Sequence, residues 1–85
     1  MTEPRETRLK RLKMRSMRRG IKEMDIILER YADDNLAGMD AAALDLYEDL
    51  LHENDQDLYQ WVTGQQPAPD RFQGLIGNIS RAISG

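Results

Sequence analysis

The side chains that could carry out chemistry are few in this chain, and they are scattered. It has one histidine, His52, and no cysteine. A metal site needs several His or Cys ligands at suitable spacing, and a catalytic centre needs a nucleophile or acid beside a base. The six glycines stand apart and form no phosphate-binding loop. The acid pair Asp33-Asp34 is typical of a solvated loop. We therefore expect a protein that is not an enzyme, with no catalytic residue, no metal and no tightly bound cofactor.

The charged residues are divided unevenly between the two ends of the chain. Residues 1–22 contain nine Lys or Arg and two Glu, a net charge of +7. Residues 23–85 contain three Arg and thirteen acids, a net charge of −10. Such a division indicates a nucleic acid, a membrane surface or an acidic protein patch as partner. Attraction between the two ends within the fold is the simpler explanation, and it is compatible with a partner.

A small nucleic-acid-binding protein is the alternative function that this basic segment supports. Its Lys and Arg residues recur every three or four positions and could follow phosphates on one helix face. The segment has no aromatic residue for base stacking, however, and an acidic body beside it would repel a duplex. No stretch is long and apolar enough for a membrane span, and the charged N-terminus has neither a secretory nor a transit-peptide pattern. We expect no nucleic acid, no membrane insertion, and a monomer when free.

The elements that must position these residues are helices. Apolar residues follow helical spacing along almost the whole chain, and no alternating strand pattern is present. We predict an all-α fold, a single small five-helix bundle over residues 1–85, with a basic N-terminal helix over 1–19 and an acidic helical body over 20–85. At 85 residues the chain can bury one modest core.

The expected helix boundaries follow from capping residues and apolar spacing. The first helix starts near Thr2 or Glu3, with Pro4 in its first turn, and the second runs from about Gly20 to Tyr31. Turn-forming residues predict a loop over 32–38. The third helix begins at an Asp40 N-cap, the fourth at Asn54 or Asp55, and Gly64 ends the fourth. The expected apolar faces comprise Leu9, Leu12 and Met17; Met24, Ile27, Leu28 and Tyr31; Ala43, Leu44, Tyr47, Leu50 and Leu51; Leu58, Trp61 and Val62; and Phe72, Leu75, Ile76, Ile79 and Ile83.

Two motifs resemble a known family. "RRGIKEMDIIL" places Arg19, Gly20 and Glu23 in the Arg-Gly-x-x-Glu spacing of the succinate dehydrogenase assembly factors, with Arg18 before them. "NDQDLYQWVTGQQP" is similar to the family's Asp-x-Asp-Leu-aromatic-x-Trp segment, which ends in Gly and Pro. The corresponding residues there are Asp55, Asp57, Leu58, Tyr59, Trp61, Gly64 and Pro67. Because order and spacing agree over roughly residues 8–80, the chain is identified as a member of that family.

The resemblance implies a fold and a function. The family's fold is a five-helix bundle, and its members promote covalent attachment of FAD to the flavoprotein subunit of succinate dehydrogenase and, in some bacteria, of fumarate reductase. The flavin bond forms on a histidine of that client, so the FAD belongs to the client. The same resemblance implies a cytoplasmic location in a bacterium and the mitochondrial matrix in a eukaryote.

The resemblance also implies a partner-binding site at Arg18, Arg19, Gly20 and Glu23. Gly20 would let a partner's backbone approach closely, and Arg19 offers a planar fork of donors to a carboxylate or to carbonyls. Glu23, one turn on and expected on the same helix face, could accept donors. A structural alternative stays open, in which Gly20 ends the first helix and Glu23 caps the second. For Trp61 we expect a core position, and for Tyr59 a partly exposed or rim position.

Overall fold

The computed structural model describes residues 3–84 and is built from helices. These are α1 (Arg5–Ser16), α2 (Lys22–Asn35), α3 (Ala41–Leu51), α4 (Asp55–Val62) and α5 (Gln73–Ser84), with two 3-10 turns, η1 (Leu36–Gly38) and η2 (Asp70–Phe72). No strand occurs within 3–84. The predicted all-α class with five helices is confirmed, while the proposed start at Thr2 lies outside the described residues.

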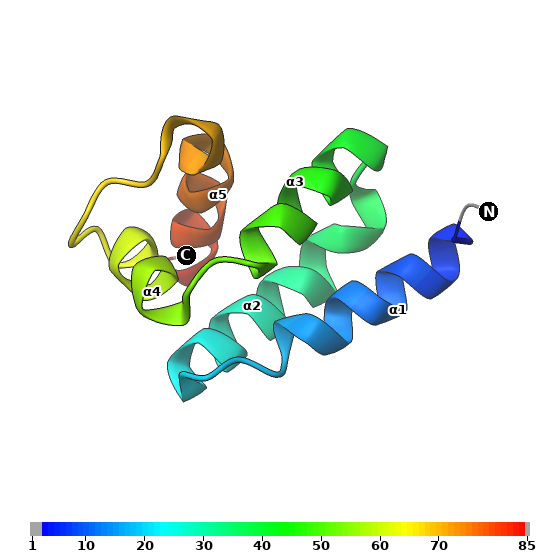
Figure 1. The fold of residues 1–85 in the computed structure, drawn as a ribbon, viewed down its shortest axis with the longest axis horizontal. Helices are drawn as coiled ribbons and strands as arrows, with labels where there is room; N and C mark the ends of the chain where they lie inside the picture. The colour runs from blue at the N-terminus through cyan, green and yellow to red at the C-terminus, as the bar shows by residue number, and fades with distance from the viewer. Residues whose placement is uncertain (1–2, 85) are drawn as a thin grey trace.

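The five helices form one elongated body of 39 × 25 × 24 Å. Helices α1 and α2 lie side by side, and α3 packs across them (Figure 1). Helices α4 and α5 pack on each other and on α2, at the end of the molecule away from the N-terminus (Figure 1). Helix α2 therefore runs through the centre of the bundle and connects its two ends.

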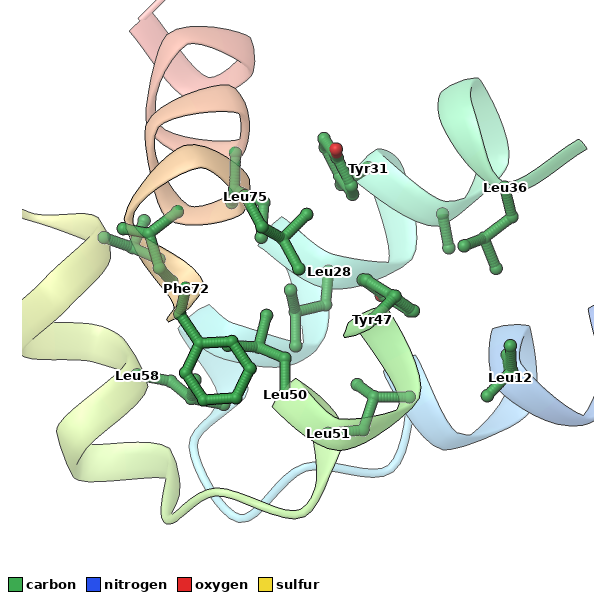
Figure 2. Packing of buried hydrophobic residues seen from close by; sticks show 14 of the residues in the cluster. Leu12, Leu28, Tyr31, Leu36, Tyr47, Leu50, Leu51, Leu58, Phe72 and Leu75 are labelled. Carbon is green, nitrogen blue, oxygen red and sulfur yellow. The ribbon is translucent and has the colours of Figure 1, made fainter. Parts of the chain in front are cut away.

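The core takes at least one side chain from every helix. Leu12 of α1, Leu28 of α2, Tyr47 of α3, Leu58 of α4 and Leu75 of α5 are all buried and belong to one cluster (Figure 2). Each helix contributes in this way because its apolar residues recur every three or four positions and so face one side. The rings of Tyr31 and Tyr47 stack within the cluster with centroids 6.1 Å apart.

Local capping signals predicted several helix ends correctly. The Asp40 carboxylate accepts a hydrogen bond of 2.8 Å from the Ala43 amide at the start of α3. Asn54 does the same for the Gln56 amide at the start of α4, again at 2.8 Å. Gly64 follows α4 with a φ of 81°, the left-handed conformation that glycine adopts without strain.

The loop predicted over residues 32–38 is wrong. Helix α2 continues to Asn35, and η1 completes the segment. The polar residues Asp33 and Asp34 suggested a loop, but they lie on the exposed face of the helix. Ala32 and Leu36 on the opposite face are buried, so the apolar stripe that packs on the core continues through both residues. Burial on one face therefore outweighs the turn-forming composition of the other.

The outer ends of two apolar stripes were also misassigned. Met17 was expected on the buried face of the first helix, and Ile83 on that of the fifth, but both side chains are exposed. The position expected for Met17 is taken by Ser16, which is completely buried at the end of α1. Its hydroxyl donates to the Leu12 carbonyl at 2.8 Å and bonds the Tyr47 hydroxyl at 2.6 Å. These two bonds make a buried serine acceptable in the core.

The two aromatic residues of α4 lie at the edge of the core. Trp61, expected in the core, is only partly buried, and its ring stacks on that of Phe72 with centroids 6.2 Å apart. Tyr59 is also partly buried, as expected for a rim position.

Candidate partner-binding site

The predicted site residues lie at the junction between α1 and α2. Helix α1 ends at Ser16, and Ile21 precedes α2 in an extended conformation with φ −115° and ψ 124°. Residues 17–21 therefore form a linker, and Arg19 belongs to neither helix. The prediction that Arg19 and Glu23 share one helix face is wrong, because only Glu23 is helical.

The Arg19 side chain is directed into its own protein. Its Nε donates to Oδ1 of Asp55 at 2.6 Å, and its Nη1 donates to the Leu51 carbonyl at 2.7 Å. Its Nη2 donates to the Glu53 carbonyl at 3.0 Å. Arg19 thus satisfies carbonyls that the end of α3 leaves without helical partners, and it pairs with the first residue of α4. The planar fork binds a carboxylate and carbonyls, but they belong to this chain.

Gly20 approaches Asp55 from the backbone side. Its amide donates to Oδ2 of Asp55, the carboxylate oxygen that Arg19 Nε does not use. A Cβ at Gly20 would lie 3.1 Å from that oxygen, tighter than an ordinary contact. Gly64 is the only residue of the described chain with positive φ, so Gly20 does not end α1 as a left-handed residue. The group that lies close to Gly20 in this structure is therefore the Asp55 carboxylate of the same chain.

The other three predicted residues are exposed at the surface. Arg18, Gly20 and Glu23 are exposed, and within residues 3–84 the side chains of Arg18 and Glu23 have no hydrogen-bond or ion-pair partner. Glu23 is the second residue of α2 and makes no capping bond, which removes the capping alternative for it. The structure therefore separates the four predicted residues into three at the surface and one, Arg19, bonded internally.

Shallow depressions flank the linker on both sides. Next to Arg18, a depression on α1 is lined by Lys10 and by the exposed Met14. Next to Glu23, a groove between α2, α4 and α5 is lined by the exposed side chains of Ile26 and Ile83. Neither isoleucine was predicted to lie at the surface. Ile83 continues the apolar spacing of the fifth helix, which suggested a core position, and no position was predicted for Ile26.

Most of the basic residues of α1 are already paired with acids of the body. Glu48 on α3 accepts hydrogen bonds from Arg8 at 3.2 Å and from Arg11 at 3.0 Å, and Arg15 lies 3.9 Å away. We refer to Glu48 and these three arginines as the Glu48 cluster. The hydrogen bond from Arg11, followed by its charge, lowers the pKa of Glu48 below its usual value. Attraction between the two ends of the chain is thus present, and phosphates would have to compete with it.

Neither a cluster of metal-binding side chains nor a membrane-spanning helix occurs in the described part of the chain. Residues 3–84 contain no group of three or more His, Cys, Asp or Glu placed to hold a metal ion. His52 lies at the end of α3, where its Nδ1 is 3.3 Å from Nη2 of Arg15. No helix within the same residues is long and apolar enough to cross a membrane.

These features define a small all-α protein in which the exposed linker between α1 and α2 is bonded to the body through Arg19 and Gly20. Residues 10–82 match the model of the family described as "Flavinator of succinate dehydrogenase". The chain belongs to this family, as its two motifs predicted.

Three relatives illustrate how similar the chain is to known members. It is 42% identical over 74 residues to "Succinate dehydrogenase assembly factor 2, mitochondrial" of Meyerozyma guilliermondii, covering 84% of this chain and 55% of that protein. The protein of the same name from Schizosaccharomyces pombe is 37% identical over 71 residues, covering 84% and 51%. "Succinate dehydrogenase assembly factor 2-B, mitochondrial" of Drosophila mojavensis is 39% identical over 76 residues, covering 87% and 48%. The chain thus spans about half the length of the curated relatives it matches.

Proposed function

We propose that this chain is a succinate dehydrogenase assembly factor that binds the flavoprotein subunit and promotes covalent attachment of FAD to it. Membership of the flavinator family supports this proposal, as do the names of the relatives. The structural observation that carries it is the exposure of Arg18 and Gly20 on the linker and of Glu23 at the start of α2, next to a linker that Asp55 binds through Arg19 and Gly20. A flavoprotein subunit of fumarate reductase is a second candidate client.

The chemistry available at this surface is recognition. Arg18 can donate two parallel hydrogen bonds to a client carboxylate, and Glu23 can accept from client donors. Gly20 presents backbone without a side chain, so client backbone can lie close to it. The flavin bond itself forms on the client's histidine, and the chain contributes by holding the client in a productive arrangement.

The FAD is expected to remain with the client throughout. The isolated chain offers no phosphate-binding loop, and its aromatic rings pack in or against the core. Titration of the isolated chain with FAD should therefore give no stoichiometric complex at submicromolar concentration. The proposed location is the compartment in which the client folds, which is the mitochondrial matrix in a eukaryote and the cytoplasm in a bacterium.

The proposal is tested by complementation. The chain is expressed in cells that lack their own assembly factor, and covalent flavin is read from the fluorescence of the denatured flavoprotein subunit. The wild-type chain should restore this fluorescence, whereas Gly20→Arg and Glu23→Ala should not. Glu6→Ala, a change of an exposed acid on the far end of α1, is the matched control and should restore it. A folded wild-type chain that restores no covalent flavin would refute the assembly function.

A further inference from the structure

The ion pair between Arg19 and Asp55 joins two family motifs that lie far apart in the sequence. We propose that these two residues are positioning residues, which hold the linker so that Arg18, Gly20 and Glu23 face the client. In this arrangement Arg19 itself makes no contact with the client. The inference rests on the proposed function, because it assigns different roles to residues of the same binding site.

The bonding of Arg19 leaves little of it for a client. Its side chain is only 10% exposed, and its Nε, Nη1 and Nη2 each donate to an acceptor of this chain. The acceptors come from the end of α3, the following turn and the start of α4. A client carboxylate could reach the guanidinium only by displacing Asp55, which is itself 14% exposed. Such an exchange would leave a mostly buried carboxylate without its cation, which is unfavourable.

Asp55 binds the linker through both of its carboxylate oxygens. Oδ1 accepts from the Arg19 side chain, and Oδ2 accepts from the Gly20 amide. On the opposite side, Oδ1 of Asp25 on α2 accepts from the Arg19 amide. Two neighbouring residues of the linker are therefore bound through backbone and side chain by acids from two different helices. These bonds fix the backbone of Arg19 and Gly20, and so they determine which side of Gly20 is exposed.

Holding the linker in advance should matter for binding. A five-residue connection that contains glycine has many conformations, and a client that binds a mobile linker must order it at the expense of affinity. The exposed residues lie on either side of the fixed peptide: Arg18 directly precedes Arg19, and Glu23 lies three residues after Gly20, in the first turn of α2. Fixing Arg19 and Gly20 therefore sets the separation and orientation of the two charged side chains.

A double-mutant cycle separates positioning from direct contact. The affinities of wild type, Asp55→Asn, Arg18→Ala and the double variant for the purified flavoprotein subunit are measured by calorimetry. Asp55→Asn leaves one side-chain oxygen as acceptor, although Nε of Arg19 and the Gly20 amide each need an acceptor. We expect Asp55→Asn and Arg18→Ala each to raise the dissociation constant at least tenfold. The dissociation constant of the double variant should exceed the larger of the two single-variant values by no more than about threefold. Independent contacts would instead multiply the two losses, which would overturn the proposal.

Amide hydrogen exchange gives a readout that does not require the client. In the free chain, Asp55→Asn should raise the exchange rate of the Gly20 amide at least tenfold, while amides of the α2 interior keep their protection. Arg19→Lys should raise it as well, because an ammonium cannot serve the three acceptors of the planar fork. Unchanged exchange at Gly20 in both variants would refute the positioning role. If wild type fails to bind the flavoprotein, the proposed function fails, and the exchange result still decides whether the pair holds the linker.

Discussion

Acidic residues bind arginines of the N-terminal segment in two different settings. In the Glu48 cluster, one carboxylate on α3 lies among Arg8, Arg11 and Arg15, and all four side chains are partly open to water. At the linker, one arginine and one carboxylate are mostly buried, and both carboxylate oxygens are used. The cluster holds more charges, yet the single pair determines more of the local structure.

The difference follows from solvation. Exposed ion pairs form in water, where the attraction is weak and each side chain must give up freedom to form it. A mostly buried pair has lost its hydration, so either partner left alone is strongly unfavourable. The Glu48 cluster therefore holds α1 against α3 through contacts that can be exchanged, whereas Arg19 and Asp55 depend on each other.

The largest expected effect on stability comes from breaking the linker pair. Arg19→Ala should lower the free energy of unfolding by about 2–4 kcal/mol, because it leaves a mostly buried carboxylate unpaired and frees carbonyls at the end of α3. Arg8→Ala, the matched change in the Glu48 cluster, should cost less than about 1 kcal/mol. Urea unfolding followed by circular dichroism measures both. Equal costs for the two variants would remove the distinction between the regions.

A second buried polar link between α1 and α3 provides an intermediate case. Ser16 and Tyr47 are both fully buried, and their hydroxyl groups form a hydrogen bond of 2.6 Å. Tyr47→Phe should cost about 1–2 kcal/mol, because it removes one of the two hydrogen bonds of the buried Ser16 hydroxyl. The double variant with Ser16→Ala should cost less than the two single changes added together. Additive costs in urea unfolding would show that the two hydroxyls do not act as a pair.

The same tyrosine should produce a stability loss at alkaline pH. Burial raises the pKa of Tyr47 to about 12, above its ordinary value of 10.0, and the hydrogen bond with Ser16 opposes this only in part. The unfolded chain therefore loses this proton first, so stability should fall as the pH rises from about 10 toward 12. Tyr47→Phe should flatten this part of the profile. A variant with the same alkaline profile as wild type would contradict the assignment.

Local signals account for the parts of this fold that the sequence predicted. The caps at Asp40 and Asn54 and the left-handed Gly64 each depend on residues no more than a few positions away. Apolar spacing located five helices for the same reason. The extension of α2 through residues 32–35 was missed because burial of Ala32 depends on packing against other elements, and composition alone does not report it.

The sequence did not predict how the candidate site residues divide between internal bonding and exposure. The motif drew attention to the linker, and nothing in the spacing around Arg19 reveals a partner 36 positions away. Asp55 was recognised only as part of a second motif and as a possible cap. Whether an arginine faces a client or its own protein depends on how the α3–α4 turn meets the linker, and that is a property of the assembled bundle.

A small effect with a defined pH range is expected in the Glu48 cluster. The neighbouring arginines, Arg11 foremost, lower the pKa of Glu48 from its ordinary 4.5. Its contribution is therefore present above about pH 4.5 and is lost as the pH falls through the lower folded value. Glu48→Gln should cost less than about 1 kcal/mol at pH 7 and still less in high salt or near pH 3. A cost that persists unchanged at acid pH would indicate a contact other than ion pairing.

The smallest effect on stability is expected at the exposed residues of the linker face, and there it separates binding from folding. Arg18→Ala and Glu23→Ala remove side chains that are exposed and have no partner within residues 3–84. Each should change the free energy of unfolding by no more than about 0.5 kcal/mol. Each should nevertheless reduce covalent flavin on the client severely, since a few central charged contacts dominate small interfaces. Arg19→Ala should reduce flavin and stability together, so the ratio of the two losses distinguishes contact from positioning.

If Arg18→Ala and Glu23→Ala fold normally and support normal flavin attachment, the client does not use this face. If they unfold the protein, the exposed side chains take part in the fold, and the contrast with the buried pair disappears.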